Sequence, residues 1–113
     1  MARYRLIVMS EPTSGREAEY NDWYNNRHLQ DVVAIPGFAG AQRFKLKELI
    51  GGEFKHRYMS IYDIEASDYG AALKQLQERA GTSAMPIDSS LDQDSVAYAV
   101  FEECSPRVLA PAR

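Results

Sequence analysis

Three residues on one face of a predicted helix have side chains suited to acid–base chemistry. Tyr20, Tyr24 and His28 follow one another at intervals of four, and Asp31 and Ile35 continue the pattern at intervals of three and four. At about 100° per residue, these five side chains fall within one narrow sector of an α-helix. An imidazole, with an unperturbed pKa of about 6.5, can accept or donate a proton near neutral pH. The spacing therefore predicts a pocket with polar groups at its edge rather than an ordinary apolar core face.

His28 is the predicted base of this pocket, and Tyr24 is the predicted hydrogen-bond donor to a substrate carbonyl or enolate. Asp31 lies one turn beyond His28 and has two interpretations. It could orient the imidazole, or it could form a solvent-exposed i,i+4 ion pair with Arg27. Arg43 also has two interpretations, because a guanidinium can bind a substrate carboxylate or phenolate, or can simply lie in solvent at the edge of a strand.

Four aromatic residues complete the predicted substrate-binding set. Tyr20 and Trp23 lie on the same helix as His28, whereas Tyr62 and Tyr98 lie on predicted strands. Packing in the core is the commoner role for such residues. We predict that at least one of the tyrosines reaches the pocket, and the sequence does not show which face of the sheet the strand tyrosines occupy.

Two helical and four strand-like segments can be recognised between turn signals. Pro36 and Gly37 end the first helix, and Gly51 with Gly52 marks a hairpin turn. The predicted strands cover residues 4–9, 39–48, 57–64 and 96–104, and the predicted helices cover residues 14–35 and 69–80. This β-α-β-β-α-β order is typical of the α+β ferredoxin-like fold, with a four-stranded antiparallel sheet and two helices on one face. We expect one domain over residues 1–104, an irregular tail over 105–113, and a long connection over 82–94 that holds a short helical turn or acts as a lid.

The first, third and fourth predicted strands are apolar on both faces. In the first strand, Leu6 and Val8 alternate with Ile7 and Met9. An antiparallel sheet with one solvated face should alternate apolar and polar residues instead. Since two helices can cover only one face, we expect the other face to pack against a second copy of the chain in a two-fold dimer.

Composition excludes several classes of function. The chain has a net charge of −3 and no basic stripe, so nucleic acid is not an expected partner. No apolar run is long enough to span a membrane, and the N-terminus lacks the apolar segment of a signal peptide. The single Cys104 cannot form an internal disulfide, which indicates a reducing compartment and predicts a cytoplasmic protein. No cluster of His, Cys, Asp or Glu has metal-ligand spacing.

Residues 19–44 resemble a known group of proteins. Their helix reads W-Y-x-x-x-H-x-x-D, followed by P-G-F and by a strand that contains R-F. Together with the order of elements, this motif resembles the dimeric α+β barrel superfamily, and within it the EthD-like proteins. The resemblance implies a homodimer whose two sheets face each other as a barrel. It also implies a small-molecule site in each subunit, between the sheet and the helices.

The superfamily does not by itself specify a reaction, because it includes cyclases, isomerases, cofactor-independent oxygenases and haem-dependent enzymes. From the residues, we predict cofactor-free proton transfer by His28 on a hydrophobic, oxygenated substrate that is aromatic, lactone or polyketide-like. Such an enzyme would be an isomerase, cyclase or lyase. One alternative is a monooxygenase, either cofactor-independent or using haem with His28 as axial ligand. The other is a protein that binds a small molecule without turnover.

Overall fold

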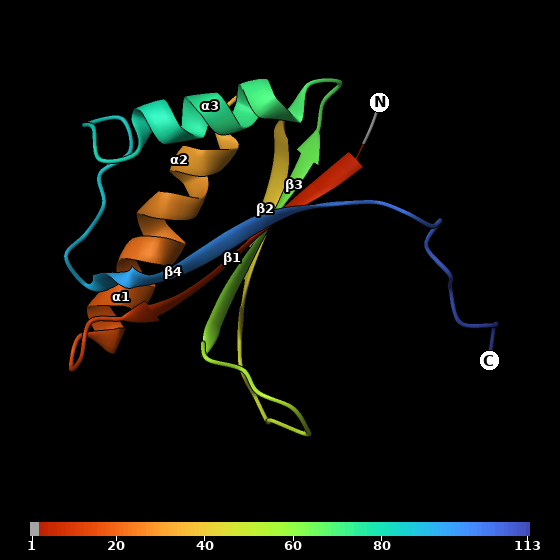
Figure 1. Ribbon diagram of the computed structural model, residues 1–113, viewed down its shortest axis with the longest axis horizontal. Coiled ribbons are helices and arrows are strands. Elements are labelled where there is room, and N and C mark those ends of the chain that lie inside the picture. Colours follow the sequence, from red (N-terminus) through yellow and green to blue (C-terminus); the bar gives the residue numbers. More distant parts are fainter. Residues whose placement is uncertain (1–2) are drawn as a thin grey trace.

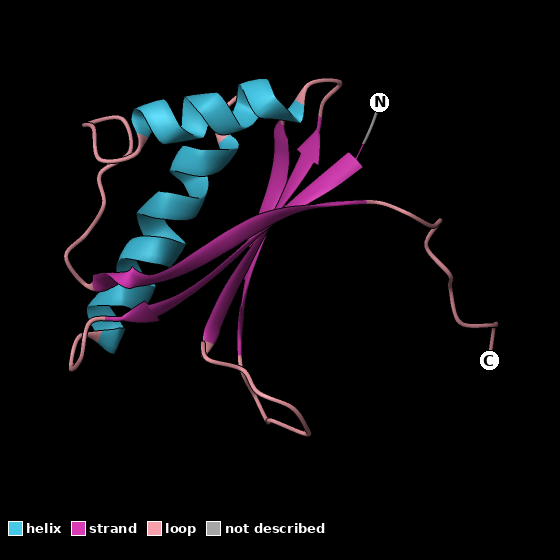
Figure 2. Ribbon diagram, viewed as in Figure 1, coloured by secondary structure: helices cyan, strands magenta, loops and turns pink. Residues whose placement is uncertain are grey.

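Four antiparallel strands form one sheet, and helices cover one of its two faces (Figures 1 and 2). The computed structural model describes residues 3–113. The strands are β1 (Arg3–Pro12), β2 (Phe38–Lys45), β3 (Tyr58–Glu65) and β4 (Leu91–Glu102), and they lie in the order β2-β3-β1-β4. The helical segments are α1 (Glu17–Trp23), the π-helical turn η1 (Tyr24–His28), α2 (Leu29–Val33) and α3 (Tyr69–Arg79). The predicted ferredoxin-like fold is confirmed.

The first helix runs without a break through α1, η1 and α2, but its middle is π-helical. The N–H of Leu29 donates to the carbonyl of Tyr24, five residues earlier, where an α-helix would use the residue four earlier. The prediction of a uniform α-helix was therefore wrong over Tyr24–His28. Because a π-turn holds more residues than an α-turn, side chains after it are rotated relative to those before it. Turns of this kind occur frequently at functional sites.

The core lies between the sheet and the helices. Even-numbered residues of β1 and β3 point toward the helices, and Leu6 pairs directly with Tyr62 in the antiparallel register. Both are 1% exposed, and they pack in the same buried cluster with Val32 of α2 and with Ile35, two residues beyond that helix. Tyr58 and Tyr62 therefore lie on the helix-covered face. The alternation of side chains along the strand could not show which of the two faces this would be.

The connection before β4 is shorter than predicted. β4 begins at Leu91, because Leu91 pairs with Pro12 and Asp92 pairs with Glu11 beyond a bulge in β1. The polar sequence here has no strand periodicity, and only pairing with β1 makes it extended. Met85 anchors the remaining connection, since its side chain is fully buried in the core.

Nothing within residues 3–113 covers the second face of the sheet (Figure 1). Ile7, Met9, Met59 and Ile61 lie on it and remain partly exposed, and Phe101 is 59% exposed. The 46–57 loop and the tail after β4 extend away from the helices (Figure 1). No helix within residues 3–113 is long and apolar enough to cross a membrane.

Candidate active site

An apolar cleft of about 180 Å³ opens between the sheet, the first helix, α3 and the connection before β4. Its lining includes Leu6 and Val8 of β1, Tyr24 and His28 of η1, Met85 and Ile87 of the connection, and Tyr98 of β4. Both the sheet and the helices therefore contribute to the cleft, and the π-turn supplies Tyr24 and His28.

The imidazole of His28 lies at the wall of this cleft. It stacks on the indole of Trp23 at a centroid distance of 4.6 Å and meets the ring of Tyr24 edge-on at 5.1 Å. Nδ1 is buried and has no hydrogen-bond partner within residues 3–113. Burial lowers the pKa of His28 to about 4, and the nearby charge of Asp31 opposes this shift only in part. The ring is therefore neutral at pH 7.

Asp31 does not hydrogen-bond the imidazole. Its Oδ2 accepts a hydrogen bond from Nε of Arg27, four residues earlier, at 2.7 Å. Of the two interpretations given above, the structure therefore shows the ion pair. Arg27 also donates to the carbonyl of Ser83 at 3.2 Å, which ties the connection to the helix. The tautomer of His28 is therefore not set by a direct carboxylate bond, and Asp31 acts on the ring only through its charge.

Two of the predicted tyrosines are core residues. The hydroxyl of Tyr20 is hydrogen-bonded to Oγ of Ser10 at 2.6 Å, and burial raises the pKa of Tyr20 to about 12. Tyr62 is 1% exposed beneath the first helix, and burial raises its pKa well above the usual value. Neither residue is part of the cleft lining, so neither is placed to meet a ligand there.

Trp23 and Tyr98 take contrasting positions around the histidine. The indole Nε1 of Trp23 donates a hydrogen bond to the carbonyl of Pro86 at 3.2 Å. This bond holds the indole ring in the position where it stacks on His28. Tyr98 lines the cleft and is 59% exposed, so it stands at the mouth.

Arg43 lies outside the cleft. Its guanidinium carbon is 4.4 Å from the ring centroid of Tyr24, a residue that lines the cleft. Its terminal nitrogens donate to the side-chain oxygens of Asn25 at 2.8 Å and Asn21 at 3.0 Å. Of the eight residues predicted for the site, the structure brings Tyr24, His28 and Tyr98 to the cleft.

Sequence reasoning missed the apolar half of the lining. Leu76 of α3, Met85 and Ile87 of the connection, and Leu91 and Val96 of β4 all line the cleft. Leu76 recurs with Ala72 and Leu73 at helical spacing in α3, and this periodicity was a usable signal. Nothing in the local pattern of the other four indicated a ligand, because they come together only when the connection folds against the sheet.

The cleft does not fit a haem. Typical pockets for drug-sized ligands have volumes of about 300–1,000 Å³. The volume of this cleft, about 180 Å³, is smaller than that range. No lysine or arginine lines the cleft to pair with porphyrin propionates. Within residues 3–113, no group of three or more His, Cys, Asp or Glu residues could hold a metal ion.

No protein-family model and no curated protein matches this sequence. Solved structures do match. An EthD family protein from Bacillus halodurans is 17% identical, with 91% of this chain and 99% of that chain covered and a TM-score of 0.57. A dimeric ferredoxin-like protein of unknown function from Jannaschia sp. is 16% identical, with coverage of 89% and 99% and a TM-score of 0.59. A mutant of MhuD with two manganese protoporphyrin IX molecules bound per active site is 18% identical, with coverage of 93% and 98% and a TM-score of 0.60. The chain thus shares its fold with these three proteins.

Proposed function

We propose that this chain is an enzyme that catalyses cofactor-free proton transfer on a small, hydrophobic, oxygenated molecule. The observation that carries the proposal is a neutral imidazole at the wall of an apolar cleft, with a buried Nδ1 that has no partner within residues 3–113. An aromatic, lactone or polyketide-like compound suits the apolar lining. Isomerisation, cyclisation or elimination are the reactions that such a base can promote.

In this mechanism His28 removes a proton from a carbon next to the substrate carbonyl. Nε2 is the accepting atom, because Nδ1 is buried. The phenol of Tyr24, whose ring lies against the imidazole, donates to the oxygen on which charge develops. An imidazolium in an apolar site is a strong acid, so it returns its proton readily. This property favours isomerisation, in which the proton is returned at a second carbon.

The test measures the incorporation of deuterium from D₂O into enolisable model compounds. The purified chain is incubated in D₂O with acetophenone and with a β,γ-unsaturated γ-lactone, and deuterium incorporation is followed by NMR. We expect exchange or isomerisation above the buffer rate, with no oxygen consumed. Oxygen uptake would favour a cofactor-independent monooxygenase instead. Retention of these compounds without exchange would favour a binding protein.

We also propose that the chain acts as a homodimer joined through the open face of the sheet. Ile61 and its apolar neighbours on β1 and β3 lie on that face without cover. The solved Jannaschia protein of the same fold is described as dimeric. The free and exposed Cys104 suits a reducing compartment such as the cytoplasm.

Replacing Ile61 by lysine is expected to weaken the dimer at least tenfold. A charge placed in the middle of an apolar interface would be buried without a partner, at a cost of several kcal/mol. Sedimentation equilibrium of wild type and variant measures the change. Lys74→Gln, on the exposed side of α3, is the matched control. A wild-type chain that sediments as a monomer would contradict the proposal.

A further inference from the structure

A second hollow lies on the β2 side of the first helix. It measures about 320 Å³ and is lined by Asn21 and Asn25 of the helix, Arg43, Phe44 and Lys45 of β2, and Tyr58 of β3. It shares no lining residue with the cleft at His28. The lining of this hollow is mainly polar, whereas the lining of the cleft is mainly apolar. The two sites therefore suit ligands of different chemistry.

Arg43 carries a charge that no carboxylate balances within residues 3–113. Its terminal nitrogens donate only to the neutral amide oxygens of Asn21 and Asn25, and its Nε is buried without a partner. The guanidinium carbon also lies over three tyrosine rings, at 4.4 to 5.2 Å from their centroids. Burying part of an unpaired charge is costly, and an anion in the hollow would offset that cost.

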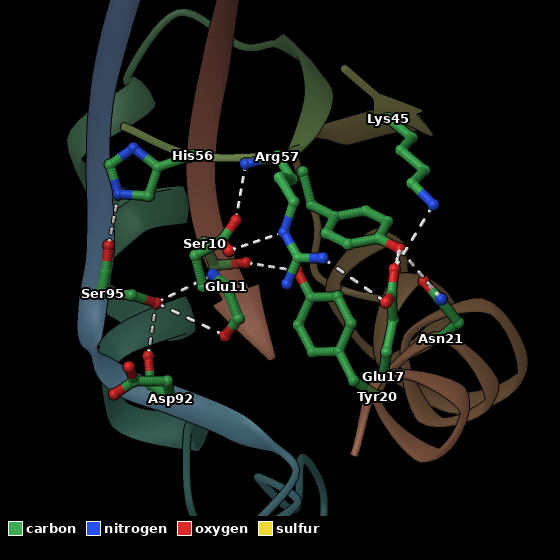
Figure 3. Close-up of polar contacts among 11 residues, drawn as sticks. Ser10, Glu11, Glu17, Tyr20, Asn21, Lys45, His56, Arg57, Asp92 and Ser95 are labelled. Atoms are coloured by element: carbon green, nitrogen blue, oxygen red, sulfur yellow. Dashed lines mark hydrogen bonds and ion pairs between the residues drawn. The ribbon is translucent and has the colours of Figure 1, made fainter. Parts of the chain in front are cut away.

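Glu17, an acidic residue that contacts two lining residues of the hollow, already has partners. Glu17 accepts a hydrogen bond from the hydroxyl of Tyr58, and its oxygens lie 3.4 Å from Nζ of Lys45 and 3.4 Å from a terminal nitrogen of Arg57 (Figure 3). These contacts lower the pKa of Glu17, with the Tyr58 hydrogen bond as the largest cause. Glu17 is therefore an ionised partner of Lys45 and Arg57, and it leaves the charge of Arg43 unmatched.

Donors are also available for an anion. Nδ2 of Asn21 donates to Tyr58 at 3.2 Å, whereas Nδ2 of Asn25 makes no hydrogen bond within residues 3–113. Lys45 lines the hollow, and its exposed side chain holds the ammonium 3.4 Å from Glu17. A guanidinium, an ammonium and an amide N–H are the groups with which proteins bind carboxylate and phosphate.

We propose that this hollow binds a small oxyanion, a carboxylate or a phosphate, held chiefly by Arg43 with Lys45 and Asn25. The site is separate from the proposed proton-transfer cleft. Tyr24 is in contact with both, since it lines the cleft and its ring lies against Arg43.

The experiment is an NMR titration of the full chain, labelled with ¹⁵N, using sodium phosphate in one arm and sodium benzoate in the other. Sodium chloride keeps the ionic strength constant. We expect saturable shifts of the Asn25 side-chain amide and of the Arg43 Nε–H signal, and the arm that saturates first identifies the class of anion. Arg43→Gln should weaken binding more than tenfold. Lys45→Gln should weaken it by roughly two- to fivefold, as for a contact worth about 0.5–1 kcal/mol.

Lys74→Gln, which removes a charge from α3 away from the hollow, should bind as wild type does. Shifts that chloride alone reproduces, or equal affinity in wild type and in both hollow variants, would overturn the proposal. If Arg43→Gln does not fold, the exposed Lys45→Gln variant decides, because its side chain supports no core packing. Deuterium exchange at the His28 cleft is measured separately, so failure of either proposal leaves the other intact.

Discussion

Replacing His28 by asparagine is expected to lower the rate of deuterium exchange by roughly 10²–10⁴-fold, the usual contribution of a positioned acid–base group. Asparagine is polar and similar in size, but it cannot accept a proton from carbon. Since the side chain of His28 makes no hydrogen bond within residues 3–113, the substitution removes no such contact. The measurement is the exchange rate of each model compound at saturating concentration, together with circular dichroism to confirm the fold.

The pH profile distinguishes a base from a merely structural histidine. Because the pKa of His28 is lowered to about 4, the ring stays neutral and active well below pH 6.5. For free enzyme, kcat/KM should therefore fall only as pH drops through about 4. His56→Gln is the matched control, since His56 lies on the 46–57 loop and bonds the carbonyl of Ser95. An exchange rate that His28→Asn leaves unchanged would remove the histidine from the mechanism.

Acid destabilisation of the wild-type chain should also be traceable to His28. The pKa of this residue is about 4 in the folded state, against 6.5 for an ordinary histidine. The unfolded state therefore binds the proton first as pH falls. The stabilisation from a neutral, buried ring is fully present above pH 6.5 and is lost progressively between pH 6.5 and 4. A difference of 2.5 pKa units corresponds to roughly 3 kcal/mol in the free energy of unfolding.

Urea denaturation at pH 7.5 and at pH 4 measures this loss in wild type and in His28→Asn. The variant should lose roughly 3 kcal/mol less than wild type over the same interval, because asparagine does not titrate. His56→Gln should follow the wild-type curve across this step. Identical pH dependence in wild type and His28→Asn would show that the ring is solvated and able to protonate in the folded state.

Local sequence patterns were sufficient to predict the order of elements and the inward face of the first helix. Runs of strand-forming apolar residues in β1 and β3, and the stops at Pro36 and Gly37, are local signals with direct physical causes. They were enough to predict the ferredoxin-like fold and to place Tyr24 and His28 on the side that meets the sheet. The doubly apolar strands also predicted the uncovered sheet face that the structure shows.

The surroundings of His28 depend on contacts that form only in the folded chain. The π-turn shifts the helix register after Tyr24, and Asp31 is bonded to Arg27 rather than to the imidazole. Arg43 meets the outer side of the tyrosines, because β2 lies at the edge of the sheet. Apart from Leu6 and Val8 of β1, the apolar lining, Met85 included, comes from segments more than forty residues after His28 along the chain. Periodicity reports only on neighbours within a few residues, whereas a cleft depends on contacts that the complete fold creates.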